Sequence, residues 1–112
     1  MWVFTQNGFL SAVRTANGSP EFKVRSRDRQ ALQGLAQYAE VEIIATPYAD
    51  YPYRVIVDEL LLGGYLLNEL ATADYTNYKD RVQVLRGKQY AQACAKVWST
   101  MHDVEDEKAR TI

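Results

Sequence analysis

The chain has almost none of the residues from which metal sites and thiol chemistry are built. Its 112 residues include one cysteine, Cys94, and one histidine, His102. One cysteine excludes an intramolecular disulfide, and one residue of each type excludes a zinc site made of several Cys and His ligands. Both lie in one predicted helix, about 12 Å apart along its axis, which excludes a direct nucleophile–base pair. We therefore predict no metal, no cofactor and no cysteine-dependent catalysis.

The sequence also lacks the features of membrane and exported proteins. Its longest apolar run, residues 60–67, has about eight residues, whereas roughly 20 are needed to span a bilayer. The first eight residues contain no basic region followed by a long apolar run, so we predict no signal peptide. A formal net charge of -1 gives no general attraction to nucleic acid or to anionic membranes. We expect a cytoplasmic protein with no membrane partner, and the lone cysteine fits a reducing compartment.

No familiar catalytic motif is present, but the composition is that of an ordinary globular domain. There is no Walker loop, no dinucleotide-binding glycine motif, no nucleophile elbow and no His-Glu-x-x-His. Hydrophobic residues make up 47% of the chain, and its length is that of one domain able to bury a core without disulfides. We predict a single α+β domain over residues 1–112, with a frayed tail over 105–112.

The first 27 residues predict a three-stranded antiparallel meander. Asn7-Gly8 and Asn17-Gly18 are strong hairpin signals, and they separate apolar strands over 2–5, 9–14 and 22–25. Counting outward from both turns predicts that one buried face carries six residues: Trp2, Phe4, Ser11, Val13, Phe22 and Val24. The same count places the basic residues on the opposite, solvated face, together with Glu21: Arg14, Lys23 and Arg25.

The remaining chain predicts two more strands and four helices. The strands cover 41–45 and 53–57, and the helices cover 29–39, 59–71, 79–85 and 88–104, with Gly87 as a break. Asp28 and Asp58 are the predicted N-caps of the first two helices. The helix over 59–71 is apolar nearly all round, which predicts wide burial, and Gly63-Gly64 in its middle predicts close packing or a kink. A βαββ unit in a ferredoxin-like arrangement then follows the meander, giving an antiparallel or mixed five-stranded sheet of order 1-2-3-5-4 with helices packed on one face.

Two short windows, residues 48–54 and 74–80, combine tyrosine, aspartate and basic side chains. Asp50, Asp74 and Asp80 could act as general bases, with Lys79 or Arg54 as anion clamps, in a metal-independent enzyme. In the structural alternative, Asp74 or Asn77 caps the next helix and the tyrosines bury their rings. We predict instead that the windows lie side by side as a binding patch for a protein partner or a second copy of the chain.

The basic sheet face offers a second candidate surface. Arg14, Lys23 and Arg25, with Arg27 beyond the strand, could contact phosphates or nucleic acid. A solvated sheet face is the structural alternative, and Glu21 dilutes the positive charge. Cys94 lies on the apolar stripe of its helix, where we expect a buried, inert thiol.

Several motifs resemble those of a family of small uncharacterised proteins from bacteria, notably actinobacteria, and their phages. They are Met1-Trp2-Val3-Phe4-Thr5, Gly8-Phe9-Leu10-Ser11-Ala12-Val13, Val24-Arg25-Ser26-Arg27, Asp50-Tyr51-Pro52-Tyr53-Arg54, Asp74-Tyr75-Thr76-Asn77-Tyr78-Lys79-Asp80 and Val97-Trp98. The resemblance covers nearly the whole chain and departs mildly at Thr76 and Tyr78, where the family usually has Pro and Phe.

The resemblance implies no activity, cofactor or partner, but it implies a shared surface. With the two windows, it gives the predicted binding residues: Arg25, Arg27, Asp50, Tyr51, Arg54, Asp74, Tyr75, Asn77, Tyr78 and Lys79. A phage origin would fit a small protein that binds a host protein. We predict no catalytic residue and a non-catalytic binding function.

Overall fold

The computed structural model describes residues 1–110, and these form two compact units. The first unit comprises Met1–Asp74 and the second begins at Tyr75. Each unit is described by itself below. None of the helices within residues 1–110 combines the length and apolar character needed to cross a membrane.

The first unit contains an antiparallel five-stranded sheet whose strand order is β1-β2-β3-β5-β4. The strands are β1 (Trp2–Thr5), β2 (Gly8–Arg14), β3 (Glu21–Ser26), β4 (Ile44–Ala45) and β5 (Tyr53–Asp58). This confirms the predicted α+β class and the predicted strand order. The fourth strand has two residues where five were predicted.

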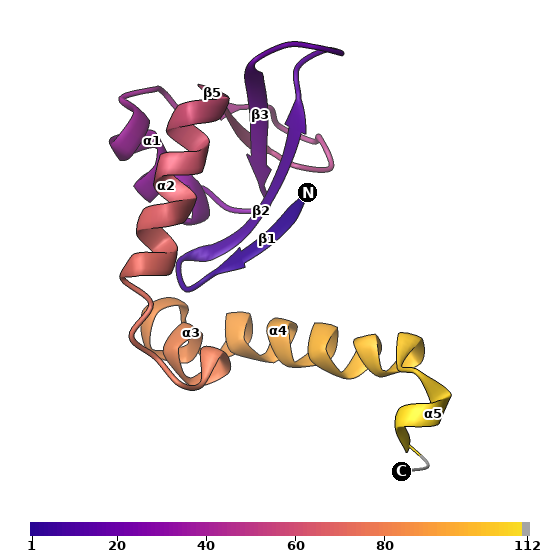
Figure 1. Ribbon diagram of the computed structural model, residues 1–112. Coiled ribbons are helices and arrows are strands. Elements are labelled where there is room, and N and C mark those ends of the chain that lie inside the picture. Colours follow the sequence, from indigo (N-terminus) through magenta and orange to yellow (C-terminus); the bar gives the residue numbers. More distant parts are fainter. Residues whose placement is uncertain (111–112) are drawn as a thin grey trace. The chain divides into compact units, whose positions relative to one another are not determined.

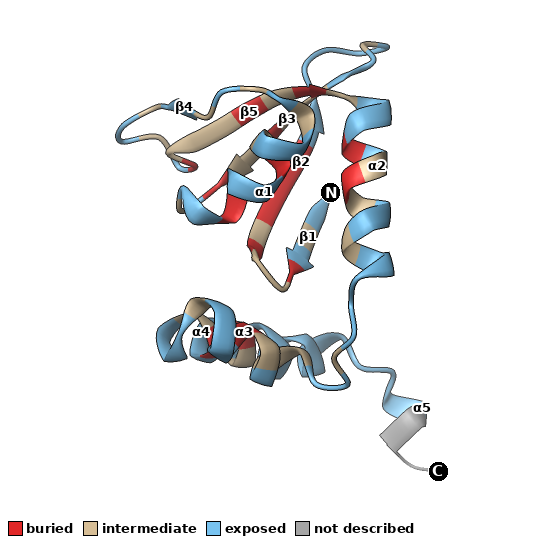
Figure 2. Cartoon of the chain, turned by 90° about the vertical axis from the view of Figure 1, so that its left-hand side faces the viewer, coloured by how far each residue is buried: buried red, intermediate tan, exposed pale blue. Residues whose placement is uncertain are grey.

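Helices α1 (Gln30–Ala39) and α2 (Glu59–Ala71) cover one face of this sheet (Figure 1). Buried residues gather where the sheet meets the two helices (Figure 2). The core consists of Leu10, Ala12, Val24, Ala31, Leu32, Leu35, Val55, Val57, Leu62 and Tyr65. Helix α1 begins one residue later than predicted, and its N-cap residue is Arg29 rather than Asp28. The predicted cap of α2 is confirmed, because the Asp58 carboxylate accepts a hydrogen bond from the Leu60 amide.

The predicted register of the meander is wrong, and the error exchanges the two faces of β3 relative to those of β1 and β2. Trp2 lies opposite Ser11, and Ser11 lies opposite Arg25. Val24 lies opposite Ala12, on the face that the helices cover. Trp2 and Val24, predicted to share a buried face, therefore point to opposite sides, and Trp2 is 71% exposed while Val24 is fully buried.

Loop length explains the error. The first turn centres on Gln6 and Asn7, because Thr5 pairs with Gly8. That change moves the pairing of β1 with β2 by two residues. A shift by an even number keeps the same β1 and β2 residues together on one face, although this face is not the buried one. The second loop is longer than a two-residue turn: Arg14 pairs with Phe22, and the Thr15 amide donates to the Glu21 carbonyl at 3.0 Å. The resulting one-residue slip moves every side chain of β3 to the other face.

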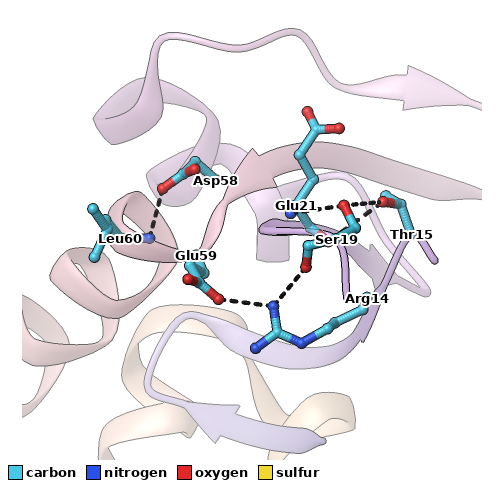
Figure 3. Close-up of polar contacts among 7 residues, drawn as sticks. All are labelled: Arg14, Thr15, Ser19, Glu21, Asp58, Glu59 and Leu60. Atoms are coloured by element: carbon cyan, nitrogen blue, oxygen red, sulfur yellow. Dashed lines mark hydrogen bonds and ion pairs between the residues drawn. The ribbon is translucent and has the colours of Figure 1, made fainter. Parts of the chain in front are cut away.

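Polar contacts hold this second loop in place (Figure 3). The Nη1 atom of Arg14 donates to the Ser19 carbonyl and to Oε2 of Glu59 at the start of α2, both at 2.7 Å. The Ser19 hydroxyl accepts hydrogen bonds from the Glu21 amide and the Thr15 hydroxyl. Arg14 thus binds the loop to α2, and its guanidinium lies 4.6 Å from the Phe22 ring centre. It does not belong to the basic face on which the sequence count placed it.

Helix α2 is less buried than predicted. Only Leu62 and Tyr65 are buried, and Leu60, Leu67 and Leu70 are largely exposed. One side of the helix packs on the core of the first unit, and its other apolar residues are exposed. The two central glycines differ: a Cβ atom on Gly64 would collide with the Tyr38 hydroxyl of α1, whereas one on Gly63 would meet nothing within 4 Å. Close packing is therefore confirmed at Gly64 alone.

Two helical glycines should respond oppositely to alanine. Gly63→Ala is expected to stabilise the first unit by about 1 kcal/mol, because alanine has the higher helix propensity and the site is open. Gly34→Ala in α1 is expected to destabilise it by about 1–3 kcal/mol. The new Cβ would lie 2.9 Å from the hydroxyl of Tyr65, which is buried and has little room to move. Urea unfolding of the two variants and the wild type measures both changes; equal shifts would contradict this packing.

The second unit is a helical hairpin followed by a short tail. Its elements are α3 (Tyr78–Arg86), α4 (Lys88–Thr100), the 3₁₀ helix η1 (Met101–Val104) and α5 (Glu107–Arg110). Gly87, with φ of +92°, separates α3 from α4 as predicted. Val82, Ala91 and Cys94 are buried between them. The predicted last helix ends four residues early, at Thr100, and the predicted frayed tail includes residues 111–112, which lie outside the described residues.

Candidate binding surface

The side of the sheet opposite α1 and α2, which we call the open face, carries the most distinctive surface of the first unit. The strand register assigns it Trp2, Phe4, Phe9, Ser11, Val13, Lys23, Arg25, Ile44, Arg54 and Ile56, with the acidic pair Glu21 and Asp58 at one end of β3 and β5. Figure 1 shows both helices of this unit on the other side of the sheet. The open face therefore combines aromatic and basic side chains, with Trp2 among the most exposed.

One row of this face crosses all five strands. In order across the sheet it consists of Trp2, Ser11, Arg25, Arg54 and Ile44. Arg25 and Arg54 thus lie directly opposite each other, and like charges in that arrangement destabilise a sheet. Nη2 of Arg25 donates to the Ser11 hydroxyl at 2.8 Å. The Nε atoms of both arginines are buried without a hydrogen-bond partner in the described part of the chain.

Tyr51 organises the neighbouring arginines. The guanidinium carbons of Arg25 and Arg27 lie 4.6 Å and 4.5 Å from the centre of its ring. Arg27 also forms an ion pair with Asp50 at 2.9 Å. Tyr51 is 9% exposed although it belongs to the loop between β4 and β5. Cation–π contacts and the ion pair therefore hold this loop against the open face.

Aromatic contacts continue from Tyr51 toward β1. The Phe9 ring lies 6.4 Å from Tyr51, stacks on Phe4 at 4.7 Å, and meets Trp2 edge-on at 5.8 Å between ring centres. We call Trp2, Phe4, Phe9 and Tyr51 the aromatic cluster. It places a continuous aromatic surface beside the Arg25–Arg54 pair, with rings in the offset and edge-on geometries that favour attraction.

Half of the predicted binding residues meet on this surface. Arg25, Arg27, Asp50 and Tyr51 are in mutual contact, and Arg54 is the cross-strand neighbour of Arg25.

Sequence reasoning missed the exposed members of this surface. Trp2 and Phe4 were assigned to the core, and Phe9 was not singled out. A signal was available, because pairing Ala12 with Val24 places Leu10, Ala12, Phe22 and Val24 on one face and leaves Trp2, Phe4 and Phe9 on the other.

The other five predicted binding residues do not belong to the open face. Asp74 is the last residue of the first unit, and Tyr75, Asn77, Tyr78 and Lys79 belong to the second unit, where most of their contacts are structural. Asp74 is exposed at the end of the first unit. The Asn77 side chain caps α3 by accepting from the Asp80 amide at 3.0 Å, which is the role that the structural alternative gave to Asp74 or Asn77. The Tyr75 and Tyr78 rings lie 6.0 Å apart. The Lys79 ammonium lies 4.8 Å from the Trp98 ring centre. Because residues 48–54 and 75–80 belong to different units, their predicted adjacency stays a prediction.

The buried Cys94 and the half-buried Tyr78 lie within hydrogen-bonding reach of each other inside the helical hairpin. Burial raises the pKa of the Cys94 thiol, although the Tyr78 hydroxyl lowers it in part. Burial also raises the pKa of Tyr78, and Cys94 raises it further. Both groups therefore remain protonated at neutral pH. Cys94 is buried as predicted, and a protonated buried thiol is a poor nucleophile.

The second unit also has a shallow depression of about 240 Å³. It is lined by Tyr75, Thr76, Asn77, Asp80, Arg81 and Val84. Lys79 is not among the lining residues, and its ammonium is directed to Trp98. The depression therefore does not bring Asp80 and Lys79 together as a base and an anion clamp.

Within residues 1–110, no group of three or more His, Cys, Asp or Glu side chains is placed to hold a metal ion. Comparisons with protein-family models, with curated proteins and with solved structures find no match. The resemblance to small bacterial and phage proteins therefore stays a prediction, and the function has to be argued from the open face itself.

Proposed function

We propose that this chain is a cytoplasmic, non-catalytic binding protein whose open face binds an acidic, partly apolar surface of a protein partner. The observation that supports this most directly is the cross-strand pair of Arg25 and Arg54 beside the exposed Trp2. The motif resemblance is to proteins of bacteria and of their phages; if the chain is phage-encoded, a host protein is the natural partner.

The arginine pair favours an anionic ligand. Two like charges opposite each other on neighbouring strands repel, so the unbound protein carries a local electrostatic penalty. A carboxylate placed between the two guanidinium groups would remove this penalty and gain charge-assisted hydrogen bonds. Relief of this repulsion upon binding adds to the affinity for an acidic partner.

The aromatic cluster favours a protein as the source of that anion. Tryptophan, tyrosine and arginine are the residues most enriched among interface hot spots. The contacts of Tyr51 with Arg25 and Arg27 fix these side chains before binding, which lowers the entropy lost when the complex forms. Trp2 and Phe4 would then supply the apolar contact area.

Charge disfavours a nucleic-acid ligand. Residues 1–74 contain nine acidic and six basic residues, which gives this unit a formal charge of -3. Asp50 is paired with Arg27 beside the open face, and Glu21 has its register position there. A polyanion would be repelled by most of this unit, whereas one or two carboxylates need only the local arginines.

The contacts of the candidate acids and bases favour binding over catalysis. Asp50 is exposed and paired with Arg27, and Lys79 contacts Trp98. A general base must reach a substrate that a pocket holds in place, and an exposed carboxylate that is already paired with an arginine is poorly placed for this.

The test is affinity capture from a nuclease-treated lysate of the source organism with four immobilised proteins. They are the wild type, Arg54→Gln, Trp2→Ala and the control Arg29→Gln. Arg29 is an exposed arginine at the start of α1, so its replacement makes the same charge change away from the open face. We expect one partner to be retained by the wild type and by the control, and at least tenfold less by the two open-face variants.

A second measurement tests whether the reduced capture by Arg54→Gln is linked to the repulsion between Arg25 and Arg54. Arg54→Gln should raise the free energy of unfolding by about 0.5 kcal/mol because it removes a like-charge neighbour. Capture that is equal for all four proteins would overturn the proposal. So would tight, Arg54-dependent binding of oligo(dT) or oligo(U) in a direct titration, which would assign the open face to nucleic acid.

A further inference from the structure

Strand β1 is an edge strand, and no strand of the first unit pairs with its outer side. The Met1 and Ala12 backbones exchange two hydrogen bonds of 2.8 Å, which makes them a hydrogen-bonded pair. In an antiparallel ladder such pairs alternate, so Val3 and Leu10 form the next one. The N–H and C=O groups of Trp2 and Phe4 therefore point away from β2, at the outer edge of the sheet.

This edge, four residues long, lacks the charges and prolines that usually protect an edge strand against pairing. Proteins guard edge strands with charges, prolines, bulges or short length. The opposite edge is guarded in this way, because β4 has two residues and is followed closely by Pro47. Strand β1 instead reads Trp-Val-Phe-Thr, without a charge or a proline, and two of its side chains are exposed aromatics.

We propose that β1 pairs with β1 of a second copy of this chain, in antiparallel orientation about a two-fold axis through Val3. Trp2 of each copy then lies opposite Phe4 of the other. The Trp2 N–H donates to the Phe4 carbonyl of the second copy, the Phe4 N–H donates to its Trp2 carbonyl, and symmetry gives two more bonds. The two sheets become one ten-stranded sheet.

A second copy of the chain is the expected partner of the β1 edge because this edge is complementary to itself. The strand offers two outward donors and two outward acceptors at positions that the two-fold axis exchanges. Trp2 and Phe4 lie on the same side of the sheet, so each copy places an aromatic ring opposite an aromatic ring. Residues 1–5 carry no charged side chain that could repel its symmetry mate, and the Met1 ammonium donates to the Ala12 carbonyl of its own chain. Because the contact is short, we expect dissociation in roughly the micromolar range.

The proposal goes beyond the proposed function and does not depend on it. It also has a consequence for the open face. Pairing at β1 keeps both open faces on the same side of one sheet, so the two Trp2 and the two Phe4 rings form its centre. A partner with two copies of an acidic surface would then bind with increased avidity.

Sedimentation velocity over about 1–300 µM protein tests the pairing, a range that brackets a micromolar constant. We expect the wild type to change from monomer to dimer with concentration. Phe4→Lys should raise the dissociation constant at least tenfold, because it removes the aromatic contact with Trp2 of the second copy and places a charge on the edge strand, where burial in the dimer would desolvate it. Phe4→Pro removes an outward N–H while the hydrogen bonds to β2 remain. The control Ile44→Lys makes a similar change on the other edge strand and should dimerise normally.

Hydrogen exchange of the Trp2 and Phe4 amides gives a second readout that does not depend on any variant. These two amides should exchange fast in dilute protein and become protected as concentration rises. A wild type that is monomeric throughout overturns the proposal. Protection that is independent of concentration, or a dimer that Phe4→Lys leaves intact, overturns it as well. Equal loss of the dimer in Ile44→Lys would assign the contact to the other edge.

Discussion

Val24→Ala is expected to lower the free energy of unfolding of the first unit by about 2–3 kcal/mol. Val24 is fully buried between the sheet and α1, where it belongs to the same core as Leu35 and Val55. The substitution removes two methyl groups and leaves a cavity that a close-packed core fills only in part. Native-state hydrogen exchange of the β3–β5 ladder amides measures this loss in the first unit alone.

Val13→Ala is the matched control, because it is the same chemical change on the neighbouring strand. Val13 lies on the open face and is 36% exposed, so we expect a loss below about 1 kcal/mol. The two valines were assigned to one buried face by sequence reasoning, which predicts equal losses. Equal losses in the experiment would therefore contradict the observed register and favour the shorter loop.

Tyr51→Ala is expected to destabilise the first unit by about 3 kcal/mol, although Tyr51 lies in a loop. Its ring is nearly buried and contacts Arg25, Arg27 and Phe9. Without the ring, Arg25 and Arg27 lose their cation–π contacts and the loop loses its attachment to the open face. Urea unfolding measures the loss, and exchange of the β4–β5 amides locates it.

Tyr48→Ala in the same loop should change stability by less than about 0.5 kcal/mol, since that side chain is fully exposed. Tyr48→Gly should even stabilise slightly, because Tyr48 has a φ of 67°, which only glycine adopts without strain. If Tyr51→Ala instead left stability unchanged and abolished partner capture, Tyr51 would be an interface residue rather than part of the support for Arg25 and Arg27.

Local signals in the sequence were sufficient for the elements and for several of their ends. Asp58 caps α2 as predicted, Asn77 caps α3 as the structural alternative had it, and Gly87 separates α3 from α4. Each of these depends on contacts within four residues of the chain, which composition and spacing encode directly. The strand order was also predictable, because short loops place consecutive strands side by side and the crossover through α1 leaves few arrangements.

Tertiary contacts decided which face of β3 is buried, and with it the candidate binding surface. The register depends on the loop after Arg14, which is held by Ser19 and by Glu59, 45 residues further along the chain. A turn signal such as Asn17-Gly18 predicts a hairpin but does not specify how many residues its loop contains.

The meeting of Tyr51 with Arg25 and Arg27 depends in the same way on a β5 strand that pairs with β3 across the intervening helix. The sequence by itself determined the order of the main strands and helices, the caps of α2 and α3, and the presence of Tyr, Asp and Arg motifs. Only the tertiary structure placed Trp2 and Phe4 beside the arginines, because a one-residue slip in pairing exchanges the two faces of a strand.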